Sequence, residues 1–138
     1  MDPLRPFDTN MQLLGKVLDL RAQKAQVISS NIANAETPGY HSSRFDFEED
    51  LANALGRRKG ITLSTSHETH IPIGPANFDS INGKIVTEED QNVIGDGNEV
   101  SVDQEMLALS ENELLYETSA QLLKKKMTLL KYVISGGQ

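Results

Sequence analysis

Apolar residues recur at alternating intervals of three and four along the first third of the chain. Such intervals place side chains on one face of an α-helix, so we predict a long amphipathic helix there. Pro3 and Pro6 disfavour helix at the start, so residues 1–8 are expected to form a loose lead-in. The seam consists of Met11, Leu14, Leu18, Arg21, Ala25, Ile28 and Ile32, and Arg21 is its one charged residue.

A second stripe runs beside this seam on the same predicted helix. A helix with two apolar stripes has more than one face to bury. We expect one stripe to pair within the chain and the other to meet another subunit; the alternative is that both face one broad core. The second stripe consists of Leu13, Val17, Leu20, Lys24 and Val27, and it ends in Asn31 and Asn34.

The predicted helix ends within residues 30–40, where the chain turns. Thr37 precedes Pro38, and the residue before a proline is disfavoured in the α conformation. Pro38-Gly39 fits the two central positions of a type II turn. Tyr40 is expected to pack the turn back onto the helix. The residues of this motif are Ser30, Asn31, Ile32, Ala33, Asn34, Thr37, Pro38, Gly39 and Tyr40.

Residues 41–98 have a different character, with prolines, glycines and short apolar runs. We expect an extended piece at 44–47, a short helix at 48–55 that Gly56 stops, and extended or strand-like segments at 60–65 and 71–75. Asn82-Gly83 is a hairpin signal. Residues 87–98 are acidic and glycine-containing, so they are expected to form a linker.

A second heptad pattern fills the last third of the chain. Its helix is predicted to begin near Ser101, which can act as N-cap, and to end at Ser135-Gly136-Gly137. Glu113 is the one charged residue of this seam. The seam consists of Val102, Met106, Leu109, Glu113, Tyr116, Ala120, Leu123, Met127, Leu130 and Ile134.

The two interrupting charges suggest a register for the helices. If the helices pack antiparallel, Arg21 can face Glu113, and such a pair would specify register more than it adds stability. Ile32 then lies opposite Val102, so the turn at 30–40 is a hinge where both helices leave the pair. Asn31 and Asn34 would lie on the remaining free face, where we predict contact with a neighbouring subunit.

The predicted fold class is mainly α. Residues 1–40 and 99–138 form one inner layer, an antiparallel coiled coil, and residues 41–98 form a small irregular middle region with short β segments. A chain of 138 residues is about one domain, and its 5% aromatic content favours the thin aliphatic core of a helix pair. The net charge of −7 argues against nucleic-acid binding.

Candidate chemistry is sparse. His67-Glu68-Thr69-His70 has one residue too few for the zinc motif that places two histidines on one helix face, so exposed loop histidines are expected. There is no cysteine for a disulfide or thiolate site. Neither a signal peptide nor an apolar run of about 20 residues is found, so we expect a soluble chain that uses no cleaved signal. We expect no cofactor and no small-molecule substrate.

The motif at 30–40 resembles the N-terminal signature of bacterial flagellar axial proteins, the rod, hook and hook-associated proteins. That signature follows the N-terminal helix with the pattern Asn-[Leu/Ile]-Ala-Asn-x-x-Thr-x-Gly-Tyr. The C-terminal part is similar too, through Gly97-Asn98-x-Val100 and the helix that follows. With the short length and Phe45-Asp46-Phe47, these features look most like one of the two short proximal rod proteins.

The resemblance implies a structural, non-enzymatic subunit of the drive-shaft. It implies export through the flagellar type III apparatus without a cleaved signal, and helical assembly in the periplasm. The implied partners are copies of the chain, other rod proteins, the MS ring, the export gate and the adaptor FliE. Two other classes stay open: a cytosolic coiled-coil adaptor or export chaperone, and a metal-dependent hydrolase using His67, Glu68 and His70.

Overall fold

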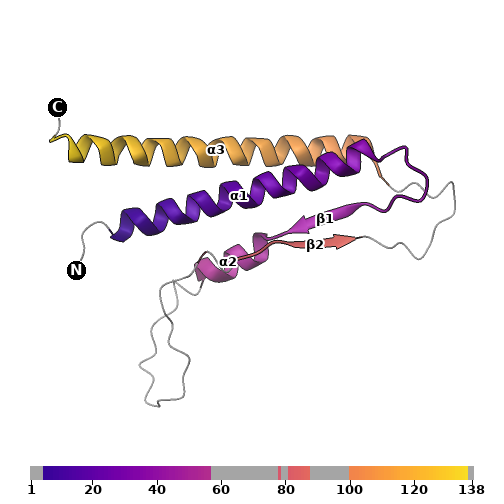
Figure 1. Ribbon diagram of the computed structural model, residues 1–138, viewed down its shortest axis with the longest axis horizontal. Helices are drawn as coiled ribbons and strands as arrows, with labels where there is room; N and C mark the ends of the chain where they lie inside the picture. The colour runs from indigo at the N-terminus through magenta and orange to yellow at the C-terminus, as the bar shows by residue number, and fades with distance from the viewer. Residues whose placement is uncertain (1–4, 57–77, 79–80, 88–99, 137–138) are drawn as a thin grey trace, which may run out of the picture.

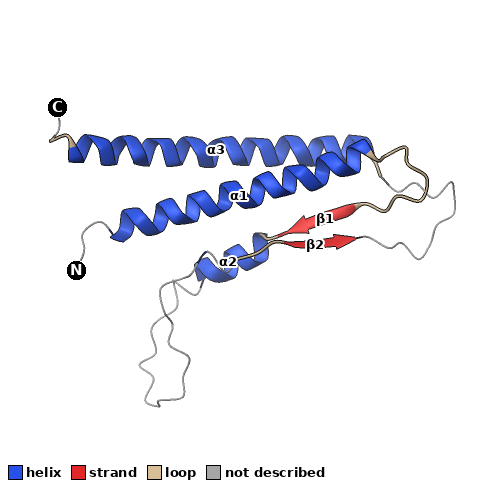
Figure 2. Cartoon of the chain, in the orientation of Figure 1, coloured by secondary structure: helices blue, strands red, loops and turns tan. Residues whose placement is uncertain are grey.

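The computed structural model describes residues 5–56, 78, 81–87 and 100–136. In chain order the elements are α1 (Arg5–Ala33), β1 (Ser43–Asp46), α2 (Glu48–Gly56), β2 (Lys84–Thr87) and α3 (Val102–Ile134) (Figures 1 and 2). Two long helices at the two ends of the chain and a small two-stranded sheet between them confirm the predicted fold class.

Helix α1 forms the middle layer of the molecule. It packs on α3 along one side and on β1 along the other (Figure 1). The two long helices run antiparallel, so that α1 begins at the end of the pair where α3 ends. The turn after α1 lies at the opposite end and brings the chain back along α1 as β1. The signature turn is therefore the point at which the chain passes from the helix pair to the sheet layer.

The second stripe of α1 is buried within the chain, against the middle region. Leu20 belongs to a core cluster with three phenylalanines, and Leu13 and Val27 pack against it. The expectation that this stripe meets another subunit is therefore wrong. The periodicity of α1 shows that two of its faces must be buried. It does not show that the middle region of the same chain packs against one of them. The buried cluster consists of Leu20, Phe45, Phe47, Phe78 and Ile81.

The sheet joins segments that are far apart in the sequence. Strands β1 and β2 pair antiparallel, with Ser43 opposite Thr87 and Asp46 opposite Lys84. Asn82-Gly83 precedes β2 and does not connect the two strands, so the hairpin that this dipeptide suggests is not the pairing that forms. Gly83 instead lies under the Phe45 ring: a Cβ atom at position 83 would be 1.8 Å from Phe45 Cζ. The close approach of this ring requires a glycine.

The helix boundaries differ from prediction at one end only. Helix α1 begins at Arg5, so Pro6 lies in its first turn, where a backbone N–H would lack an intrahelical acceptor in any case. Ser101 is the N-cap of α3, and its carbonyl oxygen accepts the Glu105 N–H at 3.0 Å. Gly136, with φ +73°, ends α3 as predicted.

The extended piece at 44–47 and the short helix before Gly56 are confirmed as β1 and α2. Several other predictions lie outside the described residues: the strand-like segments at 60–65 and 71–75, the linker over 88–98, and the histidines at 67 and 70.

Candidate functional site: the signature turn and the faces of the helix pair

The turn after α1 has the geometry that Pro38-Gly39 predicts. The backbone N–H of Tyr40 donates to the Thr37 carbonyl oxygen at 3.2 Å, and Gly39 has φ +73°. A positive φ at the third residue of a four-residue turn is the requirement of type II, which glycine meets without steric cost. Thr37, Pro38 and Gly39 are all exposed, so the tip of the turn faces outward.

Asn31 fastens this turn to the strand that follows. Its side chain is 1% exposed and forms three hydrogen bonds within the chain. Nδ2 donates to the Ser43 carbonyl oxygen at 2.8 Å, and Oδ1 accepts the Ser43 N–H at 3.0 Å. Oδ1 also accepts the Tyr40 hydroxyl at 3.1 Å. The amide thus pairs with β1 as a neighbouring strand residue would. A side chain so enclosed leaves no surface for another subunit, and that prediction is wrong for Asn31.

The Asn34 side chain caps the end of α1. Its Nδ2 donates to the Ser30 carbonyl oxygen at 2.8 Å, and its Oδ1 accepts the Thr37 hydroxyl at 3.4 Å. The Tyr40 ring folds back as expected, since its hydroxyl also lies 3.5 Å from Ser30 Oγ. Of the remaining motif residues, Ile32 is half-buried and Ala33 is exposed. Contact of Asn34 with a neighbouring subunit stays a prediction.

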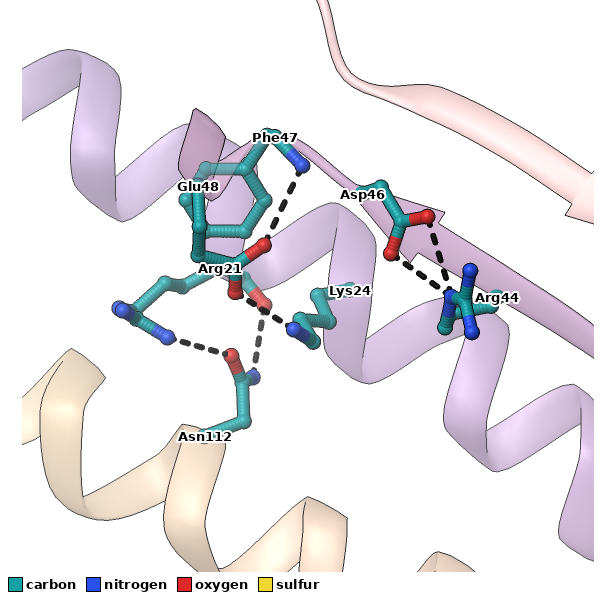
Figure 3. Close-up of polar contacts among 7 residues, drawn as sticks. All are labelled: Arg21, Lys24, Arg44, Asp46, Phe47, Glu48 and Asn112. Carbon is teal, nitrogen blue, oxygen red and sulfur yellow. Dashed lines mark hydrogen bonds and ion pairs between the residues drawn. The ribbon is translucent and has the colours of Figure 1, made fainter. Parts of the chain in front are cut away.

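The helix pair is held in register by Arg21 and Asn112 (Figure 3). Arg21 Nη1 donates to Asn112 Oδ1 at 3.2 Å, and Asn112 Nδ2 donates to the Arg21 carbonyl oxygen at 2.9 Å. Asn112 is 3% exposed, whereas Glu113 is exposed to solvent. The predicted pairing of Arg21 with Glu113 is therefore wrong by one residue. One residue along a helix is a rotation of about 100°, so Glu113 points away from the interface.

The Arg21 guanidinium also lies over an aromatic ring. Its Cζ is 5.4 Å from the centroid of Phe47, within the range of a cation–π contact. Its buried Nε finds no acceptor among the described residues. Arg21 thus links all three layers, because Asn112 belongs to α3 and Phe47 directly follows β1.

Lys24 ties α1 to the start of α2. Its Nζ contacts Glu48 Oε1 at 2.5 Å and lies 5.6 Å from the Phe47 centroid. Partial burial raises the pKa of the Glu48 carboxyl, but the Lys24 ammonium and the Phe47 and Glu48 backbone N–H groups outweigh it. The net pKa therefore lies below the usual value.

The predicted seams divide between covered and open positions. On α1, Ile28 is buried, and Met11, Leu14, Leu18, Arg21, Ala25 and Ile32 are half-buried. On α3, Leu109, Ala120, Leu123 and Leu130 are half-buried, while Val102, Met106, Glu113, Tyr116, Met127 and Ile134 are exposed.

The covered face of α3 includes a polar row that sequence reasoning missed. Glu105, Asn112, Ser119 and Lys126 are each buried or half-buried, and they follow one another at intervals of seven. An apolar pattern cannot reveal such a row, because all four side chains are polar. Only their shared heptad position could have marked them as one face.

Large apolar side chains remain exposed on several faces of α3. A shallow groove also lies beside α1, lined by Leu18, Ala120, Leu123 and Met127 among others. A helix with apolar residues on all sides is normally buried on all sides. The exposed residues are Val102, Met106, Leu107, Leu114, Leu115, Tyr116, Leu122, Met127, Leu129, Tyr132, Val133 and Ile134.

Within the described ranges, no cluster of three His, Cys, Asp or Glu residues is placed to hold a metal ion. None of the described helices is both long and apolar enough to span a bilayer.

The comparisons with known proteins agree with this geometry. The sequence model of the family "Flagella basal body rod protein" matches residues 18–41, the end of α1 and the signature turn. A relative from Yersinia enterocolitica is 32% identical over 97% of this chain and 99% of its own length. One from Aeromonas hydrophila is 33% identical over 96% and 97%, and one from Bacillus subtilis is 31% identical over 96% and 98%.

The chain therefore belongs to the flagellar basal body rod proteins, and it is a structural subunit of the rod. Within that family its resemblance is to FlgB, the name that all three of these relatives carry.

Proposed function

We propose that this rod subunit polymerises by burying the exposed apolar faces of α3 between copies of the chain. The main observation in support is that α3 is 33 residues long and has large apolar side chains exposed along its whole length. Exposed apolar area on this scale marks a protein interaction surface. Burial of one large apolar side chain contributes about 1.5–3 kcal/mol, so a row of them can hold a stiff assembly.

The proposal assigns the inner layer of the rod to the terminal segments, residues 1–40 and 99–138. The middle region, residues 41–98, would lie outside that layer. The motif at 30–40 would be the hinge between them, supported by its place where the chain leaves the helix pair. The hinge is stiff in this proposal, because the amide of Asn31 joins α1 directly to β1.

Membership of the rod family supports a proposal for the neighbours and the location. We propose a periplasmic position at the base of the rod, beside the MS ring, the export gate and FliE, and secretion through the flagellar type III apparatus without a cleaved signal. The function is mechanical, transmission of torque, and involves no catalysis. The short rod protein FlgC is the alternative within the class, and the relatives named FlgB favour the first assignment.

Co-purification with basal bodies tests the proposal. Detergent-extracted basal bodies should contain the chain, and Leu122→Gln together with Leu129→Gln should reduce its incorporation at least several-fold. A matched variant, Ser110→Gln, changes an exposed residue on another face and should incorporate normally. A cytosolic adaptor or export chaperone would instead be absent from the purified structures, and that result would overturn the proposal.

A further inference from the structure

A second heptad row follows α3 on an exposed face beside the one that packs on α1. Its residues recur at intervals of three and four, as in a coiled-coil seam. Leu115 is 38% exposed, Leu122 and Leu129 are 50% exposed, and Tyr132 is 58% exposed. We refer to this row as the outer seam. It consists of the half-buried Ala108 and the exposed residues Glu111, Leu115, Thr118, Leu122, Lys125, Leu129 and Tyr132.

The charges of α3 are segregated along its length. The first half carries only acidic residues and the second half only basic ones. On the outer seam the two charges are Glu111 and Lys125, fourteen residues or two heptads apart. The same interval separates Glu117 from Lys131, which lie on the far side of the helix from the outer seam. A helix of this kind repels an identical helix laid beside it in register, but attracts one that is displaced along the axis.

We propose that the outer seam binds the same seam of a second copy, parallel and displaced by two heptads, or about 21 Å at 1.5 Å per residue. A shift by whole heptads keeps every position of the seam in phase. It sets Leu115 against Leu129 of the next copy, and Ala108 against Leu122. It also sets Glu111 against Lys125. The inference rests on the proposed function and specifies the partner and register of the same surface.

The parallel direction of packing follows from the requirement that the assembly can grow by adding further copies. An open polymer needs a contact between two different patches, because a contact between identical patches closes into a dimer. In the displaced parallel arrangement, one copy uses its acidic half and its neighbour uses its basic half. Each copy then keeps the seam residues of its other half free for a further copy. An antiparallel pair would also bring acidic halves to basic halves, but it would satisfy both halves of each copy at once and stop growth.

Cysteine cross-linking tests the register, because the chain contains no natural cysteine. In basal bodies from cells that make Leu115→Cys with Leu129→Cys, mild oxidation should link copies into a ladder of dimers, trimers and larger products. The two positions of one chain are about 21 Å apart along the helix, too far for an internal disulfide. Each single variant is the matched control and should give no linked product.

The alternatives give different patterns. If the Leu115→Cys with Leu129→Cys variant gives dimers that never extend into a ladder, the contact joins identical patches, and that result would overturn the inference. Dimers from Leu115→Cys alone would show packing in register and overturn it too. If the double-cysteine variant enters basal bodies but forms no ladder, the proposed register is contradicted, whereas the proposed function as a rod subunit still stands. If the unaltered chain is absent from basal bodies, both the register and the proposed function are contradicted.

Charge reversal supplies a second measurement that does not depend on the introduced thiols. Glu111→Lys and Lys125→Glu should each lower incorporation into basal bodies several-fold, and the double reversal should restore it. Glu113→Lys is the matched control, since Glu113 is exposed on the other flank of α3. Its effect should not be rescued by Lys125→Glu. Failure of the double reversal to restore incorporation contradicts the pairing of Glu111 with Lys125.

Discussion

Asn31 shows how a single polar residue can determine the path of a chain. Its amide has a donor and an acceptor, and both meet the backbone of Ser43. A backbone strand residue would present the same two groups, so the end of α1 acts as an extra partner for β1. This buried asparagine lies within the signature motif of the family, and its hydrogen bonds supply a physical reason for an asparagine at that position.

Replacing Asn31 with Ala should lower the free energy of unfolding by about 2–3 kcal/mol, because two partly buried backbone groups of Ser43 lose their partners. Tyr40→Phe is the matched control: it removes one of the three hydrogen bonds and should cost about 1 kcal/mol. Urea unfolding followed by circular dichroism measures both. Equal effects of the two variants would contradict the role of the Asn31 amide in pairing with the strand.

Replacement by alanine is predicted to change the stability of the fold in opposite directions at Gly83 and at Gly15. Gly83→Ala places a methyl group inside the Phe45 ring volume and should destabilise by about 1–3 kcal/mol. Gly15→Ala lies inside α1, where the new Cβ would meet no atom of another described segment within 4 Å. It should stabilise by about 0.5–1 kcal/mol through helix propensity. Thermal melts of the two variants measure both changes in stability. If Gly83→Ala left the melting temperature unchanged, that result would be inconsistent with the packing of Phe45 on Gly83.

Among the elements, α1 has the most demanding position, since it packs on α3 along one side and on the sheet layer along the other. Its two stripes satisfy these two contacts. Arg21 lies on the seam that faces α3, and its guanidinium reaches Asn112 there and the Phe47 ring on the other side. An arginine can do this because its long stem carries a planar head that donates several hydrogen bonds and stacks on aromatic rings.

A double-mutant cycle distinguishes the two registers of the helix pair. Arg21→Leu and Asn112→Leu should be coupled by about 1–2 kcal/mol, because the two residues exchange hydrogen bonds in a partly buried interface. Arg21→Leu and Glu113→Leu should be additive, since Glu113 faces solvent. The free energy of unfolding of the single and double variants gives both values. Coupling of Arg21 to Glu113 instead would restore the register that the sequence suggests.

Over the residues that the structure describes, the internal core is small and the exposed apolar surface is large. The buried cluster lies between α1 and the middle region, whereas α3 is covered along the face toward α1 and exposes large apolar side chains elsewhere. A helix of this kind gains little from burial in one copy, and ordering its backbone costs about 1–2 kcal/mol per residue. Its stability is therefore expected to come from contacts between copies.

Helix content should consequently rise with protein concentration. In dilute solution the far-ultraviolet circular dichroism should show less helix than the structure contains, and the signal should strengthen as copies associate. Leu122→Gln together with Leu129→Gln should shift this gain to several-fold higher concentration. A chain that is fully helical while sedimentation shows a monomer would contradict the link between assembly and folding, and would favour a chaperone or adaptor.

The sequence by itself determined the two long helices of this protein, the end of α1 and both ends of α3. Spacings of three and four identified both long helices, and Pro38-Gly39 specified the turn, because periodicity and turn chemistry are local properties. It also identified Arg21 as the charged residue of the α1 seam. The resemblance of residues 30–40 to the family signature could also be recognised from the sequence, because the signature is one continuous stretch.

Tertiary structure decided what each face meets. It placed Asn112 rather than Glu113 opposite Arg21, turned the second stripe of α1 toward three phenylalanines, and buried Asn31 against Ser43. Each of these contacts joins residues that are distant along the chain or depends on rotation about a helix axis by a single position. A pattern of apolar residues is tolerant of such a rotation, whereas hydrogen bonds and close packing are not.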